Sequence, residues 1–147
     1  MTTWTEYGIQ EILEIALKGA SQPTSCDFHL IGGNATNLTK DAGATLYSGS
    51  TLEGQQLSGS DATRSFSGAA FTGLFTVSET DSATNRQAAT IDDVVFTASS
   101  GDITSAYGAV LVVNGYVWAC FEFTAPVTVT QGGTLTLRDC ELQISVS

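Results

Sequence analysis

The sequence predicts a mainly β protein, an antiparallel β-sandwich or jelly roll preceded by one N-terminal α-helix. Apolar side chains recur at helical spacing in only one convincing stretch, near the N-terminus. From residue 26 onward, short apolar runs alternate with polar turns, as in a sandwich. An Asn-Gly pair between two β-rich runs predicts a tight antiparallel hairpin. We expect a single domain over residues 1–147, with the helix at 3–18 and the β-sandwich at 26–147.

The composition favours strands and turns and argues against several classes of partner. Charged residues make up only 14% of the chain, and its 15 glycines favour turns and bulges. The net charge is −10 and the five basic residues are scattered, so we expect neither nucleic-acid binding nor attraction to anionic membranes. No apolar run reaches the length of a membrane span, and no signal peptide is evident.

The helix at residues 3–18 carries signals at both ends. Thr3 and Glu6 have the spacing of a capping box, in which each side chain binds the other residue's backbone amide. Lys18 stands in the last turn, and Gly19 has the conformational freedom that a C-cap needs. The apolar stripe of this helix consists of Ile9, Ile12, Leu13, Ala16 and Leu17.

After the helix the apolar period changes to two, which predicts strands. The residues from Gly32 to Ser60 are either a long loop or several short edge strands, and both interpretations stay open. The polar residues 79–84 predict a turn, and so do residues 131–133, after which the chain returns. The expected strands are 26–31, 63–77 (one bulged strand or two short ones), 87–91, 94–98, 127–130, 134–137 and 142–146.

The clearest local signal is the hairpin around Asn114-Gly115. Both residues of a type I′ turn need positive φ, which Asn and Gly adopt readily, so Val113 should pair with Tyr116. Strict alternation then makes both faces of the ribbon apolar. One face would hold Leu111, Val113, Tyr116, Trp118 and Cys120; the other would hold Val110, Val112, Val117, Ala119, Phe121 and Phe123.

Two apolar hairpin faces predict a partner, since both cannot line one sandwich core. An uncovered face would be an apolar patch of several hundred Å², which soluble monomers seldom expose. We therefore expect a homo-oligomer that covers one face of this hairpin, with the N-terminal helix as the rival cover. The candidate subunit interface consists of Leu111, Val113, Tyr116, Trp118, Ile9 and Ile12.

The sequence offers no catalytic motif, cofactor motif or metal site. His29 is the only histidine, so no nucleophile has a second imidazole to activate it, and a His-rich metal site is excluded. We expect His29 to be structural. The cysteines are odd in number and lack close metal spacing, so we expect reduced thiols at Cys26, Cys120 and Cys140. A sugar-stacking platform is a weaker candidate than core or subunit packing for the aromatic residues Trp4, Tyr7, Tyr47, Tyr107 and Tyr116.

Three segments carry a family resemblance. They are YGIQEIL at residues 7–13, GDITSAYGA at 101–109 and APVTVTQGGTL at 125–135, which together span the chain. Their order resembles a family of small tailed-bacteriophage virion proteins, whose members are head-decoration, head-fibre or tail-fibre proteins. The resemblance implies a particle component without catalytic activity, and it carries over no functional residue.

The residues and the resemblance together lead to one favoured expectation and two alternatives. The favoured function is a non-enzymatic capsid decoration (cement) protein, made in the host cytoplasm and displayed on the virion, which bridges and stabilises capsomers. Its partners would be itself, as the homotrimer that the resemblance implies, and other virion proteins, above all the major capsid protein. The alternatives are a tail-fibre or baseplate component for host attachment, and a carbohydrate-binding module.

Overall fold

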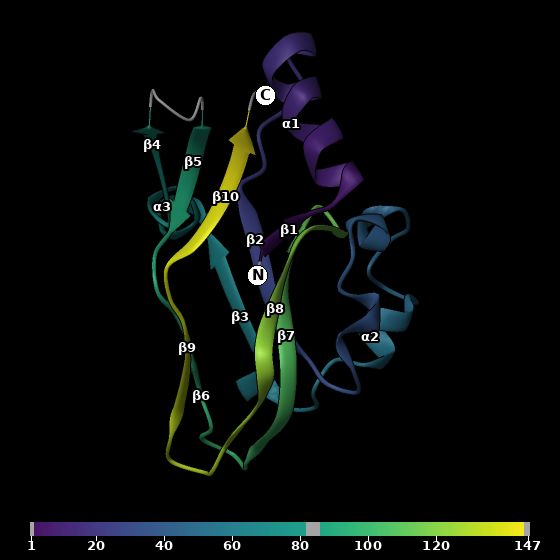
Figure 1. Cartoon of the computed structure of the whole chain (residues 1–147), viewed down its shortest axis with the longest axis vertical. Helices are drawn as coiled ribbons and strands as arrows, with labels where there is room; N and C mark the ends of the chain where they lie inside the picture. The colour runs from purple at the N-terminus through teal and green to yellow at the C-terminus, as the bar shows by residue number, and fades with distance from the viewer. Residues whose placement is uncertain (1, 82–85, 146–147) are drawn as a thin grey trace.

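The computed structural model describes residues 2–81 and 86–145 and confirms the predicted fold class (Figure 1). The protein is mainly β, with antiparallel sheets compatible with a β-sandwich and one long N-terminal helix. Among these residues, no helix has both the length and the apolar character needed to cross a membrane.

Three hydrogen-bonded sheets make up the strand framework. Their strand orders are β1-β8-β7-β2-β3, β10-β5-β4 and β6-β9. With η denoting a 3-10 turn, the elements in chain order are β1 (Thr2–Trp4), α1 (Glu6–Lys18), β2 (Ser25–Ile31), η1 (Ala35–Asn37), η2 (Lys40–Gly43), α2 (Thr51–Gly54), η3 (Ser60–Ala62), β3 (Thr63–Ser67), α3 (Gly68–Gly73), β4 (Phe75–Asp81), β5 (Arg86–Ile91), β6 (Val94–Thr97), β7 (Ile103–Val113), β8 (Tyr116–Val129), β9 (Thr134–Leu137) and β10 (Cys140–Ser145).

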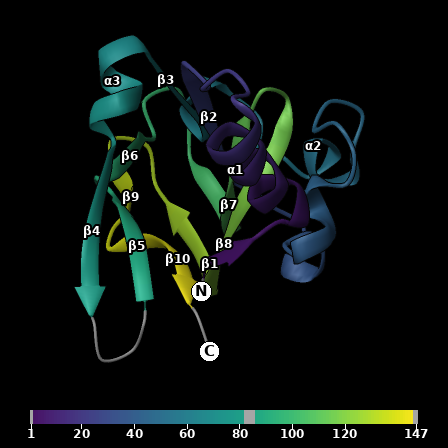
Figure 2. The ribbon, with the colours of Figure 1, turned by 90° about the horizontal axis from the view of Figure 1, so that it is seen from above.

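The five-stranded sheet forms one layer, and the other two sheets form the layer opposite. In that second layer β5 leads into β6, and β9 leads into β10, so the two small sheets follow one another along the molecule (Figure 1). The main core lies between the layers, with Phe28 and Phe121 from the large sheet, Phe96 from the two-stranded sheet, and Ile91 and Leu142 from the three-stranded one. Viewed from above, the segment with α2 lies on the far side of β7 and β8 from β4 and β5 (Figure 2).

β7 and β8 form the predicted hairpin. Val113 pairs with Tyr116, and the two turn residues Asn114 and Gly115 have φ values of 52° and 82°. Both turn residues therefore lie at positive φ, as a type I′ turn requires. Local turn chemistry sets the register at this end of the hairpin.

A β-bulge at Trp118 then changes which side chains share a face. Val112 pairs with Val117 but Leu111 pairs with Ala119, so Trp118 is the extra residue. The faces predicted for the residues after the bulge are therefore wrong, because strict alternation takes no account of an inserted residue. One core contains Leu111, Val113, Trp118, Ala119 and Phe121, and the opposite one contains Val110, Val112, Val117 and Cys120.

Both faces of the hairpin are covered within the chain. The Leu111 face belongs to the main core, against which Ile12 and Ile15 of α1 also pack. The opposite face is covered by the polar segment between β2 and η3, which contributes Leu38, Tyr47 and Leu52. The expectation that one hairpin face needs a partner chain is thus corrected, because the chain supplies both covers itself.

The covering segment, residues 32–60, is more than a plain loop. It forms the short turns η1, η2 and α2, together with isolated bridges from Gln56 to Ile31 and from Leu46 to Tyr116. Isolated leucines in this polar stretch supply its buried contacts. Neither of the two open interpretations, a long loop or several edge strands, describes it fully.

The N-terminal helix begins later than predicted. Residues 2–4 form β1, in which Thr3 pairs with Cys120, so the capping box between Thr3 and Glu6 does not form. Thr5 is the N-cap instead. The predicted end is confirmed, since Gly19 caps α1 with a φ of 70°.

The predicted strands at 26–31, 87–91 and 94–98 are confirmed to within one residue. The 63–77 region becomes two strands, β3 and β4, but the short helix α3 separates them and they join different sheets. Residues 79–81 continue β4, so the predicted turn is wrong there, and residues 82–84 lie outside the described part.

The C-terminal strands also differ in their pairing. β8 runs unbroken to Val129, and β9 pairs with β6 through Val94 and Leu137 rather than returning along β8. The predicted last strand is confirmed as β10, which ends at Ser145 and pairs with β5.

Candidate functional site

The six residues predicted at a subunit interface do not form one surface. Leu111, Val113 and Trp118 are only 1%, 2% and 8% exposed, so they have almost no surface left for a partner. Tyr116 is half-buried, and its ring stacks on that of Tyr7 with centroids 3.9 Å apart. The hairpin part of the predicted interface therefore lies inside the chain.

The outer face of α1 is different, because large apolar side chains remain uncovered there. Ile12 packs against the core, but Ile9, Leu13 and Leu17 are 43%, 52% and 79% exposed. These three residues lie four positions apart and form one row along the helix. We call Ile9, Leu13 and Leu17 the α1 ridge.

Charged and polar side chains border the α1 ridge, and the bordering glutamates form ion pairs with lysines. A shallow groove on this face is lined by Glu6, Gln10, Glu14 and Lys18 in addition to the ridge. Lys18 Nζ lies 3.5 Å from Glu14 Oε1, and Gln10 Nε2 donates to the same oxygen at 3.3 Å. The ion pair has the helical i,i+4 spacing that a Glu-to-Lys pair prefers.

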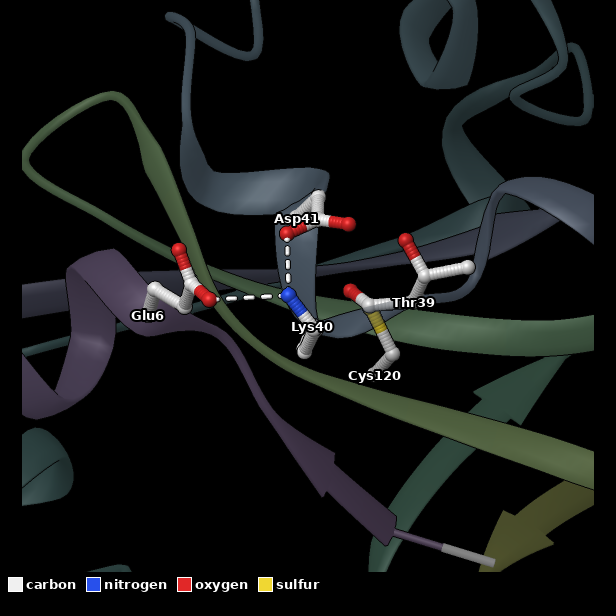
Figure 3. Close-up of polar contacts among 5 residues, drawn as sticks. All are labelled: Glu6, Thr39, Lys40, Asp41 and Cys120. Atoms are coloured by element: carbon white, nitrogen blue, oxygen red, sulfur yellow. Dashed lines mark hydrogen bonds and ion pairs between the residues drawn. The ribbon is translucent and has the colours of Figure 1, made fainter.

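A second lysine pairs with the first turn of α1 (Figure 3). Lys40 Nζ donates to Asp41 Oδ1 and to Glu6 Oε1, both at 2.8 Å. These hydrogen bonds raise the pKa of Lys40 above its ordinary value. Both lysines of the chain thus lie beside α1, where each pairs with a glutamate, although the whole chain carries a net charge of −10.

Buried contacts at the start of α1 determine which of its faces points outward. The Thr5 hydroxyl donates to the carbonyl of Val117 and accepts from the amide of Gly8 at 3.0 Å. The Thr5 amide also donates to the Trp118 carbonyl at 2.9 Å. A Cβ at Gly8 would lie 2.5 Å from that same carbonyl oxygen, so only glycine fits there. The start of α1 therefore packs against the β-bulge at Trp118, and the ridge faces solvent.

A polar cleft of about 390 Å³ beside His29 is the second candidate site. His29 Nδ1 lies 3.1 Å from Thr63 Oγ1, and its ring stacks on Tyr47 at 4.8 Å. Burial lowers the pKa of His29, so the imidazole is neutral at pH 7. Asp27 and Glu53 are the acidic residues of the cleft wall.

The polar atoms of this cleft mainly brace the fold. Tyr47 Oη donates to Gln56 Oε1 at 2.7 Å, and Gln56 Nε2 donates to Thr63 Oγ1 at 3.2 Å. Cys26 contributes to one wall of the cleft, but its side chain lies in the core between the layers, where burial raises its pKa to about 12, so its thiol stays protonated near neutral pH. Over residues 2–81 and 86–145, no three His, Cys, Asp or Glu side chains gather where they could hold a metal ion.

The aromatic residues considered for sugar stacking do not present an open platform. Tyr47 is buried, and Trp4, Tyr7, Tyr107 and Tyr116 are half-buried. Trp4 instead lines an apolar cavity of about 360 Å³ between the layers, together with Trp118. Trp4, Tyr7 and Tyr116 pack against the main core, and Tyr47 belongs to the opposite one.

Sequence reasoning identified the residues of the α1 ridge but did not separate them from the buried ones. Ile12 and Ile15 pack inward while Ile9, Leu13 and Leu17 point outward, so α1 is apolar on both sides. The apolar stripe of α1 is wider than one buried face needs, and this width is the sequence signal for an exposed apolar row. The predicted stripe did not include Ile15.

No protein-family model matches the chain, and no curated protein or solved structure matches it.

Proposed function

We propose that this chain is a non-enzymatic structural protein of a bacteriophage particle. In this proposal it is displayed on the capsid surface as a decoration protein that bridges and stabilises capsomers. The α1 ridge carries the proposal, because three large apolar side chains are exposed on a helix that buried hydrogen bonds hold in place. Such a surface acts through protein contact rather than through chemistry.

The chemistry of the polar cleft supports a role without catalysis. Its imidazole faces a threonine hydroxyl and a tyrosine ring, and the adjoining Cys26, whose side chain lies in the core between the layers, has a raised pKa. A nucleophile needs a base in contact or a lowered pKa, and Cys26 has a raised one. Protein binding is therefore favoured over group transfer.

Charge supports a protein that works in many copies at a crowded surface. A net charge of −10 keeps neighbouring molecules apart wherever no specific contact forms. Beside the α1 ridge, Lys18 pairs with Glu14 and Lys40 pairs with Glu6 and Asp41, so contact there meets less of that repulsion. A tail-fibre or baseplate role uses the same contact and differs in location and copy number.

The test is the composition of purified particles. Phage particles released by cells that carry this gene are purified on a density gradient, and the chain is quantified against the major capsid protein by mass spectrometry. A copy number comparable with that of the capsid protein supports decoration, and a handful of copies supports the tail alternative. Absence of the chain from the particles contradicts both.

A matched pair of variants tests the ridge on the same particles. Leu17 and Val77 are 79% and 77% exposed, but Val77 lies on β4, in the wall of the apolar cavity that Ile12 and Ile15 on the other side of α1 also line. We expect Leu17→Asp to lower the number of copies per particle and Val77→Asp to leave it unchanged. Equal incorporation of both variants would show that the ridge is not the contact.

A further inference from the structure

We propose that the α1 ridge is the contact between two copies of this chain, which pair through antiparallel α1 helices. The inference deepens the proposed function, because it names the partner of the ridge that function uses. In this pair a twofold axis passes near Leu13, the middle residue of the ridge. The contact is isologous, so the same surface serves both copies.

The ridge is self-complementary in its apolar residues. Leu13 lies midway between Ile9 and Leu17, four residues from each. A twofold axis at Leu13 therefore brings Leu13 against its own copy and Ile9 against Leu17 of the partner subunit. Each exposed apolar side chain of the ridge meets another one, and no apolar residue faces a charge.

The charges at the two ends of α1 complement each other in the same arrangement, whereas the two Glu14 residues come close to one another near the twofold axis, each paired with its own Lys18. Glu6 keeps its pair with Lys40. Lys18 stands in the last turn and Glu6 in the first. With a rise of 1.5 Å per residue, Lys18 lies about 7.5 Å beyond Leu13 and Glu6 about 10.5 Å before it. An antiparallel pair thus sets Lys18 of each copy beside Glu6 of the other. Lys18 has three N–H donors, so it can keep its pair with Glu14 as well.

A threefold arrangement does not match this charge pattern. Helices that pack along their whole length around a threefold axis run parallel, so Glu6 would meet Glu6 and Lys18 would meet Lys18. The helix dipoles would also align in parallel, whereas an antiparallel pair sets each positive end beside a negative one. The physical chemistry of the ridge therefore favours a pair over the trimer that the family resemblance implied.

Sedimentation of the purified full chain at micromolar concentration tests the pairing. We expect a species of twice 15.3 kDa. Leu13→Asp should give a monomer with an unchanged circular dichroism spectrum, and the control Val77→Asp should remain paired. A wild-type monomer, a trimer, or a Leu13→Asp variant that still pairs would overturn the proposal.

Cysteine cross-linking tests the antiparallel direction. The background variant is Cys140→Ser, which leaves Cys26 and Cys120 as buried thiols. Mixing the Ile9→Cys and Leu17→Cys variants should give a cross-linked dimer under mild oxidation, whereas Ile9→Cys alone should not. Cross-linking of Ile9→Cys with itself, or no product from the mixture, would contradict the arrangement.

The outcomes separate this inference from the proposed function. A chain that is monomeric in solution but abundant on particles contradicts the pairing and leaves the proposed function intact. A dimer that is absent from particles contradicts the function and leaves the pairing intact.

Discussion

At the scale of single residues, Thr5 joins two parts of the chain that lie far apart in the sequence. Its hydroxyl caps α1 through the Gly8 amide and also donates to Val117, 112 residues away, while the whole side chain is buried. Replacing Thr5 with Val keeps the shape but leaves two buried backbone groups without this partner. We expect a loss of about 2–3 kcal/mol of unfolding free energy, measured by urea denaturation. Thr5→Ser keeps the hydroxyl and should lose much less; equal losses for both would rule out the hydrogen bonds as the cause.

Asp61 is a carboxylate whose pKa the fold lowers. Its carboxylate accepts from Ser99 Oγ at 2.6 Å and from the Ser100 amide at 2.7 Å. These hydrogen bonds lower the pKa of Asp61 from 3.8 to about 2. Because the folded-state pKa is depressed, the stabilisation is complete above the unfolded-state pKa and is lost as pH falls through the folded-state pKa.

The prediction for Asp61 concerns the difference between wild type and Asp61→Asn. We expect the wild type to be more stable at neutral pH, by an amount that stays constant down to about pH 5 and shrinks between about pH 4 and 2. Urea denaturation at a series of pH values measures this. Asp92→Asn, at an exposed aspartate, serves as the control. A difference that does not change below pH 4 would contradict the lowered pKa.

At the scale of elements, the two faces of the large sheet have separate covers, and each contains one buried cysteine. Cys26 belongs to the core between the layers, whereas Cys120 lies under the segment of residues 32–60, in the cluster to which that segment contributes Leu52. Cys120 Sγ also donates to the Thr39 carbonyl at 3.8 Å (Figure 3). Burial raises the pKa of both thiols to about 12, so neither reacts readily in the folded protein.

Shortening a buried side chain of the segment 32–60 should therefore expose the Cys120 thiol and leave the Cys26 thiol protected. We expect Leu52→Ala to cost about 2–4 kcal/mol and to accelerate alkylation of Cys120, with little effect on Cys26. Mass spectrometry of peptides after timed iodoacetamide labelling measures both rates. Leu46→Ala, at a 52% exposed position, is the control. Equal acceleration at both cysteines would indicate global unfolding rather than local opening of the cover.

At the scale of the whole molecule, pairing through the α1 ridge links stability to concentration. A ligand or partner that binds only the folded state stabilises it by mass action, and a second copy is such a partner. We expect the thermal midpoint of the wild type to rise with protein concentration. The Leu13→Asp variant should show a midpoint independent of concentration. Differential scanning calorimetry over a wide range of concentrations measures this, and a flat wild-type profile would contradict the pairing.

Local chemistry in the sequence was enough to determine several features of this protein. Asn114-Gly115 determined the hairpin turn, and Gly19 determined where α1 ends, because both positions need φ values that few other residues adopt. Alternating apolar residues determined the mainly β class and most strand positions. The apolar residues of α1 were recognised as a stripe, although their orientation was not.

Only the tertiary structure decided the remaining features. The bulge at Trp118 exchanged the faces of the residues after it, and the polar segment 32–60 became the cover that removed the need for a partner on the hairpin. The helix begins at Glu6 with Thr5 as its N-cap, and the buried contacts of Thr5 decided which apolar residues face outward. The physical reason is common to all of these. Each depends on contacts between residues distant in the chain, such as Thr5 with Val117 or Leu52 with the hairpin, and a periodic pattern within one segment contains no record of them.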